Sequence, residues 1–378
     1  MSLDKLKDKL LKNDFKLSGA FGLISKISAN TIDATGLKVS IGDIVNIIGE
    51  SKKELGMVTQ IYQGGASVCP FGFVEGFKIG DRIYANNQGM NIPVGDGLLG
   101  RVVDPFMNPK DEKGPINATS FVPIMRAPID ALKRGLINEP FSVGVKAIDG
   151  LLTCGKGQKL GIFAGSGVGK STLMGMIVKH SSAPIKVVAL IGERGREVPE
   201  FIQKNLGGDL NDTVMIVATS DDSPLMRKYS AFCAMSVAEY FKNQGKDVLF
   251  IMDSVTRFAM AQREIGLALG EPPTSKGYPP SVLTLLPQLM ERAGKEDGKG
   301  SITAFFTVLV EGDDMSDPIA DQSRSILDGH IVLDRNLTDF GIYPPINILN
   351  SASRVMSDVI SQEHLLNARK FKKLYSLL

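Results

Sequence analysis

The chain has 378 residues, of which 43% are hydrophobic and 22% are charged, and its formal net charge is +2. This length predicts two or three domains, and this composition is ordinary for a soluble globular protein. So small a net charge makes no global electrostatic case for binding nucleic acid or a membrane. Cys69, Cys154 and Cys233 lack metal-ligand or CxxC spacing, which indicates reduced thiols in a cytosolic protein.

The first 91 residues predict a short helix followed by a small all-β domain. The leucines of residues 2–13 share one helical face, so the segment 1–17 either docks on its own domain, binds a partner or is frayed. Over residues 18–91, β-branched runs separated by Gly, Asn and Asp turns indicate a β-barrel or sandwich. The expected strands are Gly22–Ile27, Ile32–Val39, Ile44–Ile48, Gly56–Tyr62 and Arg82–Ala85.

Residues 92–355 predict an irregular, proline-rich connection and then an α/β domain. From Lys159 onward, strands rich in Val, Ile and Phe alternate with helices, which is typical of a mostly parallel sheet covered on both faces. The expected strands are Leu160–Phe163, Lys186–Ile191, Val214–Ala218, Val248–Met252, Thr303–Val310 and His330–Leu333. The expected helices are Thr172–Lys179, Val198–Lys204, Leu225–Phe241, Val255–Leu269, Ser281–Met290 and Ile319–Leu327. Ligands of such sheets bind beyond the carboxyl ends of the strands.

The segment after the first of these strands has the composition of a phosphate-binding loop. It consists of Ala164, Gly165, Ser166, Gly167, Val168, Gly169, Lys170, Ser171 and Thr172. Glycines let backbone N–H groups face phosphate oxygens, and the following helix presents its positive end. Lys170 can reach the β/γ-phosphates of ATP, and the Ser171 hydroxyl can bind Mg²⁺. The strict pattern has glycine where this chain has Ala164; the alternative is a glycine-rich turn with a solvated lysine.

Two carboxylates follow neighbouring strands and are candidates for the chemistry. Asp253 could organise Mg²⁺ through water or could be a helix N-cap. Glu193 could orient and partly deprotonate the water that attacks the γ-phosphate, or it could pair with Arg194 or Arg196. Arg194 and Arg257 are candidates for contacting phosphate or holding Glu193, or for structural ion pairs.

Several separate motifs resemble the catalytic subunits of the F-type and V-type rotary ATPase superfamily. They are GERGRE (192–197), DSVTRFAMAQREIGLALGEPP (253–273), TSKGYPPSV (274–282) and ILDGHIVLDR (326–335). Within this superfamily, nearly the whole chain looks most like the flagellar type III protein export ATPases, in which AGSGVGKST with alanine first is typical. The resemblance implies a RecA-like P-loop core after a small N-terminal β-barrel.

The resemblance also implies roles for site residues. It matches Lys170 to the phosphate-loop lysine, Ser171 to the magnesium hydroxyl and Glu193 to the catalytic glutamate, with Arg194 beside it. Asp253 matches the second acidic motif. Arg354 matches an arginine finger donated across a subunit interface, and from the residues alone it could equally form a helix-start ion pair. Tyr343 matches an aromatic residue that packs on adenine, or it packs in the core beside its two prolines.

The resemblance further implies a homohexamer that works at the inner face of the cytoplasmic membrane, with ATP and Mg²⁺. Its implied partners are a regulator protein at the N-terminal helix, a central stalk protein, an export gate and chaperone–substrate complexes, with no nucleic acid. We expect the loop 270–280, including Tyr278, to be exposed and to touch the stalk or a passing substrate. Family members continue into a helical C-terminal domain, whereas here 24 residues follow Arg354. Residues 356–378 are expected to begin a truncated domain, with one helix from Asp358 to Tyr375.

Four other functions remain open. The nearest is the homologous ATPase of a virulence secretion injectisome. A rotary proton-pumping subunit is disfavoured. In those enzymes the catalytic glutamate and the finger arginine, which match Glu193 and Arg354, typically lie on different subunits, whereas this chain has both. A hexameric RNA translocase would need basic and aromatic residues in its N-terminal domain, and residues 18–91 have no basic stripe. A non-catalytic nucleotide-binding module would lack a functional carboxylate at position 193.

Overall fold

The computed structural model describes residues 21–86, 90–310 and 317–377. The chain divides into two compact units, Met1–Gly89 and Met90–Leu378, and each is described by itself. The N-terminal helix expected over residues 2–13 lies outside the described residues. In the described part of the chain, no helix is both long enough and apolar enough to cross a membrane.

The N-terminal unit contains a closed antiparallel barrel with the strand order β1-β2-β5-β4-β3-β6. Its strands are β1 (Phe21–Ile27), β2 (Ile32–Thr35), β3 (Ile44–Ile48), β4 (Lys53–Tyr62), β5 (Gly65–Pro70) and β6 (Arg82–Asn86). Apolar side chains from alternate positions, such as Ile32, Ala34, Val45 and Ile47, fill the interior. The sequence patterns missed β5, whose first three residues are small, although all six of its residues are buried.

Within the described residues, the second unit is built on a nine-stranded sheet. Eight strands follow the order β19-β18-β12-β17-β15-β13-β14-β8, and β16 pairs with β17. Their bounds are β8 (Val102–Val103), β12 (Lys159–Ala164), β13 (Ile185–Glu193), β14 (Thr213–Thr219), β15 (Val248–Asp253), β16 (Gly294–Lys295), β17 (Ser301–Leu309), β18 (Gly329–Leu333) and β19 (Ile346–Ser353). The β18–β19 and β16–β17 pairs are antiparallel, and the other pairs are parallel. This sheet confirms all six strands predicted for the α/β part.

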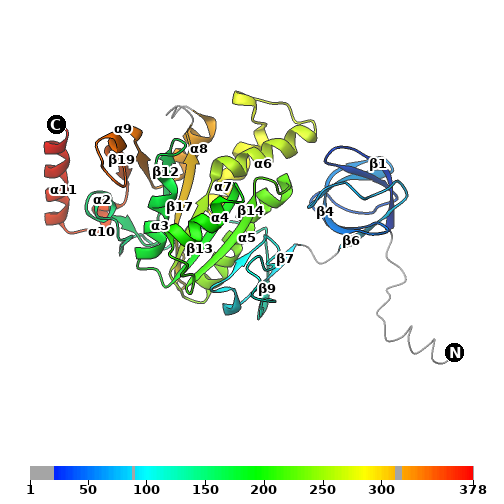
Figure 1. The fold of residues 1–378 in the computed structure, drawn as a ribbon, viewed down its shortest axis with the longest axis horizontal. Coiled ribbons are helices and arrows are strands. Elements are labelled where there is room, and N and C mark those ends of the chain that lie inside the picture. The colour runs from blue at the N-terminus through cyan, green and yellow to red at the C-terminus, as the bar shows by residue number, and fades with distance from the viewer. Residues whose placement is uncertain (1–20, 87–89, 311–316, 378) are drawn as a thin grey trace. The chain divides into compact units, whose positions relative to one another are not determined.

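Helices cover both faces of this sheet (Figure 1). The longer ones are α3 (Lys170–His180), α5 (Pro224–Asn243), α6 (Val255–Ala268), α7 (Pro280–Met290) and α8 (Pro318–Ile326). The shorter ones are α2 (Lys146–Leu151), α4 (Glu197–Glu200), α9 (Arg335–Asp339) and α10 (Met356–Val359). A further long helix, α11 (Gln362–Tyr375), packs against α2 and α10. On one face, α2 and α3 share a core with strand residues such as Leu249 and Ile251. On the other, α5 packs against β13, β14 and β15. The mixed α/β class predicted from the sequence is confirmed.

The proline-rich connection is better ordered than its composition suggests. It forms a two-stranded sheet of β7 (Asn91–Val94) and β9 (Ser120–Pro123), and it also supplies β8. Further along the chain, β10 (Pro140–Phe141) pairs with β11 (Cys154–Gly155).

The fully buried Arg292 side chain holds the connection to the domain, because it donates to the Ile124 carbonyl at 2.8 Å and to both carboxylate oxygens of Glu239 at 2.7 and 2.8 Å. A buried charge needs such pairing.

Two predicted helices differ from the structure. The helix expected over Val198–Lys204 is α4 followed by a π-helical turn, Phe201–Asn205, which buries Phe201 and packs on α3. The single C-terminal helix expected from Asp358 to Tyr375 is wrong, because α10 ends at Val359 and α11 begins at Gln362. The Ser361 side chain caps α11 by accepting a hydrogen bond from the His364 backbone N–H, which starts a new helix there.

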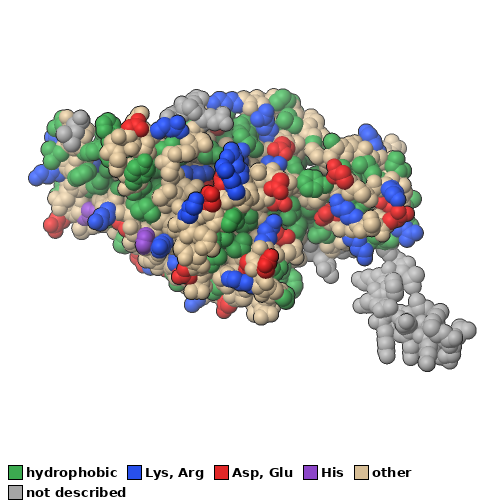
Figure 2. Space-filling view, viewed as in Figure 1, with side chains coloured by type: hydrophobic (Ala, Val, Ile, Leu, Met, Phe, Trp, Pro, Cys, Tyr) green, Lys and Arg blue, Asp and Glu red, His purple; other side chains and the backbone are tan. Residues whose placement is uncertain are grey.

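Charged side chains of both signs are interspersed on the molecular face drawn in Figure 2. This agrees with the near balance of 43 basic and 41 acidic residues.

Candidate active site

The phosphate loop lies between β12 and α3, near the middle of the sheet. Gly167 and Gly169 have φ angles of 76° and 100°, which residues with a Cβ rarely adopt, so these two glycines are required by the backbone. Val168 points the other way, since its side chain is buried in the core. The Arg335 guanidinium, at the start of α9, donates to the Ser166 carbonyl at 2.6 Å and holds the loop from outside.

Three charged side chains from different elements converge on the start of α3. The Lys170 Nζ atom lies 2.5 Å from Asp253 Oδ1 and 3.8 Å from Glu193 Oε1. Asp253 ends β15 and Glu193 ends β13, and these two strands are neighbours in the sheet. The buried Thr307 hydroxyl, on β17, donates to Asp253 Oδ1 at 2.7 Å. The parallel topology therefore brings both carboxylates to the carboxyl edge of the sheet.

Asp253 is not the N-cap of α6. The Ser254 side chain is the cap, because it accepts a hydrogen bond from the Arg257 backbone N–H. The carboxylate of Asp253 instead faces Lys170 and Thr307. The helix-cap alternative is therefore wrong for Asp253.

Glu193 is held in an environment that disfavours its charge. Its Oε1 atom is buried and has no hydrogen-bond partner in the described part of the chain. Burial, and secondarily the negative charge of Asp253, raise the pKa of Glu193 to about 7, although Lys170 opposes the shift. The ion-pair alternative with Arg194 does not hold, because Arg194 is exposed and its ion pair, at 3.8 Å, is with Glu197.

A pocket of about 410 Å³ surrounds these groups. Among the predicted site residues, its walls include Gly165, Ser166, Gly167, Gly169, Lys170, Ser171, Thr172, Glu193, Arg194 and Arg257. The Arg257 Nε atom is buried and, within the described residues, has no hydrogen-bond partner. Its stem packs on Gly192, where a Cβ would come within 3.0 Å of the Arg257 Cβ.

Tyr343 and Arg354 are not among the residues that line this pocket. Tyr343 is exposed. A Cβ atom built on Gly169 would lie 3.7 Å from the Cδ atom of Pro345. The segment that carries Tyr343 and Pro345 therefore runs beside the phosphate loop. Packing of Tyr343 in the core is therefore wrong. Arg354 follows β19 at the level of Gly329, the first residue of β18, and it donates to the Arg324 carbonyl at 3.3 Å. It lies at the opposite end of β18 from the phosphate loop.

The chain is similar to proteins of known families. The ATP synthase alpha/beta family, nucleotide-binding domain, matches residues 144–353. A "Flagellum-specific ATP synthase" of Helicobacter pylori (strain J99 / ATCC 700824) is 67% identical over 379 residues, which cover all of this chain and 87% of the relative. The chain belongs to the type III export ATPases of the ATP synthase alpha/beta family.

Two further comparisons support this membership. The "Flagellum-specific ATP synthase" of Bacillus subtilis (strain 168) is 49% identical over 94% of this chain and 82% of the relative. A solved structure of the "assembled ATPase EscN in complex with its central stalk EscO", from the enteropathogenic E. coli type III secretion system, matches with a TM-score of 0.88 and 47% identity. That match covers 94% of this chain and 86% of EscN. The chain is accordingly a P-loop ATPase.

The residues of this ATPase fit a nucleotide with its magnesium ion. Ser171 and Asp253 would hold Mg²⁺, directly and through water, and bound Mg²⁺ would neutralise phosphate charge. Among the described residues, no group of three or more His, Cys, Asp and Glu could hold a metal without the nucleotide. Lys170 already pairs with Asp253, so an incoming phosphate competes with Asp253 for the lysine.

Sequence patterns missed Thr307 and Arg335. Thr307 lies in an apolar strand that predicts only core packing, and contact with Asp253 depends on the register between β15 and β17. Arg335 is 165 residues from Lys170 in sequence, so only the fold brings it to the phosphate loop.

We expect Thr307→Val to lower the free energy of unfolding by about 0.5–1.5 kcal/mol, because the variant removes one of the two donors to Asp253 Oδ1 and leaves only Lys170. Thr307→Ser is the matched control, since it keeps the hydroxyl. Urea unfolding of both variants measures the difference. Equal midpoints for the Val and Ser variants would contradict a stabilising role for this hydrogen bond.

Proposed function

We propose that this chain hydrolyses ATP to energise flagellar type III protein export, and that it docks and releases chaperone–substrate complexes at a membrane export gate. Glu193 carries the proposal for hydrolysis, because its buried Oε1 atom has no hydrogen-bond partner among the described residues and lies 3.8 Å from the phosphate-loop lysine. The 67% identity with a flagellum-specific relative over the whole chain supports flagellar rather than virulence export. The enzyme would then act at the inner face of the cytoplasmic membrane.

The roles within the site follow from this proposal. Lys170 binds the β/γ-phosphates, and Ser171 and Asp253 organise Mg²⁺. Glu193 orients the attacking water and accepts its proton, while Arg257 and the exposed Arg194 are available to the phosphates. Tyr343 packs on adenine from the segment beside the loop.

We also propose a homohexamer in which Arg354 completes the site of a neighbouring subunit. Its position away from its own phosphate loop supports this role. The EscN structure, described as an assembled ATPase with its central stalk, supports a ring with a stalk partner. A regulator protein at residues 1–17 completes the proposed set of partners.

Lys170→Ala, introduced into the chromosomal gene, tests the export function. We expect flagellar subunit proteins to disappear from the culture medium and swimming to be lost, because the variant cannot hold the phosphates. Lys146→Gln, at an exposed lysine of α2, is the control and should swim normally. Normal swimming of the Lys170→Ala strain, together with loss of a secreted virulence protein, would favour the injectisome alternative.

A further inference from the structure

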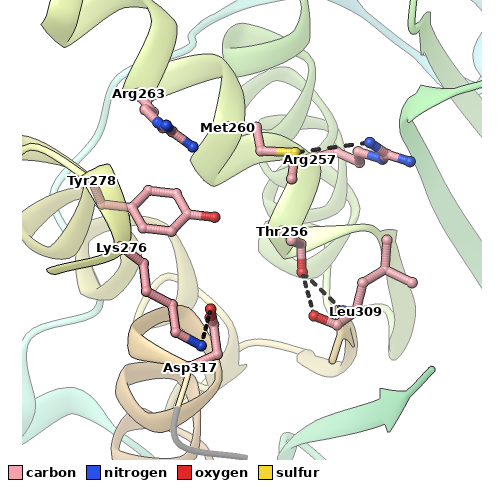
Figure 3. A pocket seen from close by; sticks show the side chains of 8 residues that line it. All are labelled: Thr256, Arg257, Met260, Arg263, Lys276, Tyr278, Leu309 and Asp317. Carbon is pink, nitrogen blue, oxygen red and sulfur yellow. Dashed lines mark hydrogen bonds and ion pairs between the residues drawn. The ribbon is translucent and has the colours of Figure 1, made fainter. Parts of the chain in front are cut away.

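The helix α8 has charged side chains at both ends, and they differ in their partners. At its start, Asp317 Oδ1 accepts from the backbone N–H groups of Ile319 and Ala320 at 2.9 and 3.4 Å. Asp317 Oδ2 lies 3.6 Å from the Lys276 Nζ atom (Figure 3). In the last turn lies Arg324, which is exposed. Its guanidinium forms no ion pair or hydrogen bond with any residue that the structure describes.

The fold places this unpaired arginine beside Arg354. Only Leu327 and Asp328 separate α8 from β18, and the Arg354 backbone N–H, just after β19, donates to the Asp328 carbonyl at 3.0 Å. The Arg354 guanidinium donates to the Arg324 carbonyl at 3.3 Å. Arg354 is exposed too, and it forms no ion pair within the described residues. Two guanidinium groups without carboxylate partners therefore share one part of the surface.

The ring of His330, on β18, lies within reach of both charges. Burial, the charge of Arg324 and the charge of Arg354 lower the pKa of His330, although the backbone of Asn350 opposes the shift. The ring packs edge-on against Phe163, with the ring centroids 6.3 Å apart. A neutral imidazole neither pairs with the arginines nor adds a third charge to them.

The acidic side chains that are nearest in sequence do not compensate the two arginines. Asp328 Oδ2 accepts from the Lys159 backbone N–H at 3.0 Å. Asp321, one turn before Arg324 on α8, is exposed and forms no ion pair with it. Like charges that lie close together repel, so an anion between them is favoured. Guanidinium groups suit phosphate in particular, because their planar N–H donors match its oxygens.

We propose that Arg324 is a second arginine that binds the phosphates of ATP in the neighbouring subunit, beside Arg354. The inference rests on the proposed action of Arg354 across the subunit interface. A phosphate between the two guanidinium groups accepts hydrogen bonds from both and relieves their mutual repulsion. Arg324 then has two parts in the site, because its carbonyl orients Arg354 and its side chain supplies a further charge.

Arg324 could instead stabilise its own helix, since a cation in the last turn interacts favourably with the helix dipole. That role predicts an effect in whichever chain carries the substitution, whereas phosphate binding predicts an effect only on the site of the neighbour. Arg324→Gln is suited to this distinction. It removes the guanidinium but keeps the main-chain carbonyl that orients Arg354.

Mixed assemblies identify the subunit that Arg324 serves. A host chain with Arg354→Ala keeps Glu193, and a donor chain with Glu193→Gln keeps Arg354, so a host beside a donor has a complete site if Arg354 acts between subunits. Adding Arg324→Gln to the donor should lower the recovered kcat about tenfold, as expected for one charge-assisted contact with phosphate. Adding it to the host should leave the recovery unchanged. Arg369→Gln in the donor, at an exposed position of α11, is the matched control.

Arg324→Lys in the donor should recover more hydrolysis than Arg324→Gln, because lysine keeps the charge and lacks only the planar fork. Equal losses from the donor and host placements would overturn the proposal in favour of the helix-stabilising role. A donor with Arg324→Gln that restores as much hydrolysis as the parent donor would also overturn it. Either result leaves the proposed function and the action of Arg354 intact. No recovery from the parent mixture would refute the action of Arg354 between subunits, and this inference with it.

Discussion

Glu193→Gln should keep ATP binding and lower the rate of ATP hydrolysis by about 10²–10⁴-fold, the usual contribution of a positioned general base. Glutamine preserves the shape of the side chain beside Lys170, so the phosphates are still held, but it cannot accept a proton from water. Binding of a fluorescent ATP analogue and phosphate release measure the two effects separately. Unchanged turnover would refute the assignment of Glu193 and would favour another residue as the base.

The same residue predicts the pH dependence of hydrolysis. The pKa of Glu193 is raised to about 7 by burial and by the charge of Asp253. Because the base must be deprotonated, the wild-type rate should increase as pH rises through about 7. The residual rate of the Gln variant should lack this step. A wild-type profile that is flat between pH 6 and 8 would contradict this role.

The raised pKa also predicts a change in stability with the opposite dependence on pH. A carboxylic acid with a higher pKa in the folded state, here about 7 against 4.5, favours folding while it is protonated. Its contribution is fully present below about pH 4.5 and is lost as pH rises through 7. At pH 8 the Gln variant should therefore be more stable than the wild type, by about 1–3 kcal/mol in urea unfolding. Glu363→Gln, at an exposed position of α11, should change stability little at any pH.

The elements that sequence patterns predicted well are those whose burial alone determines their type. β12 and β15 are buried at every position, so their continuous apolar runs identify them as central parallel strands. β5 was missed because its small residues have little strand propensity, and closure of the barrel supplies its partners. The break between α10 and α11 depends on one cap, Ser361, inside a pattern that otherwise continues as a helix.

The residues of the candidate site likewise fall into those that sequence patterns predict and those that depend on the fold. Lys170, Glu193 and Asp253 could be named from the sequence, because each follows a predicted strand and parallel strands end at one edge. The hydrogen bond from Thr307 and the burial of Tyr278 depend on register and on side-chain packing, which a sequence pattern does not specify. The loop 270–280 was expected to be exposed, and residues 272–276 are exposed, but Tyr278 is buried and Arg263 covers its ring.

Arg354→Ala should lower kcat by about 10³–10⁵-fold while changing ATP affinity much less, as expected for an arginine that stabilises the charge of the transition state. The position of Arg354 relative to the sheet supports its action on another subunit. β19 lies four strand positions from β15, so about 19 Å of sheet separates Arg354 from Asp253 at about 4.8 Å per strand. Arg354 also lies at the level of Gly329, the far end of β18 from the phosphate loop. Arg369→Ala, at an exposed position of α11, is the matched control.

Mixing two inactive variants distinguishes action within a subunit from action between subunits. Glu193→Gln chains keep Arg354, and Arg354→Ala chains keep Glu193. If both residues served the site of their own chain, every site in a mixed assembly would lack one of them, and co-expression would restore nothing. If Arg354 serves the neighbouring site, an Arg354→Ala chain that receives the arginine of a Glu193→Gln neighbour has a complete site. We therefore expect mixed assemblies of the two single variants to recover a measurable fraction of wild-type hydrolysis. Assemblies of chains that carry both substitutions should show no such recovery.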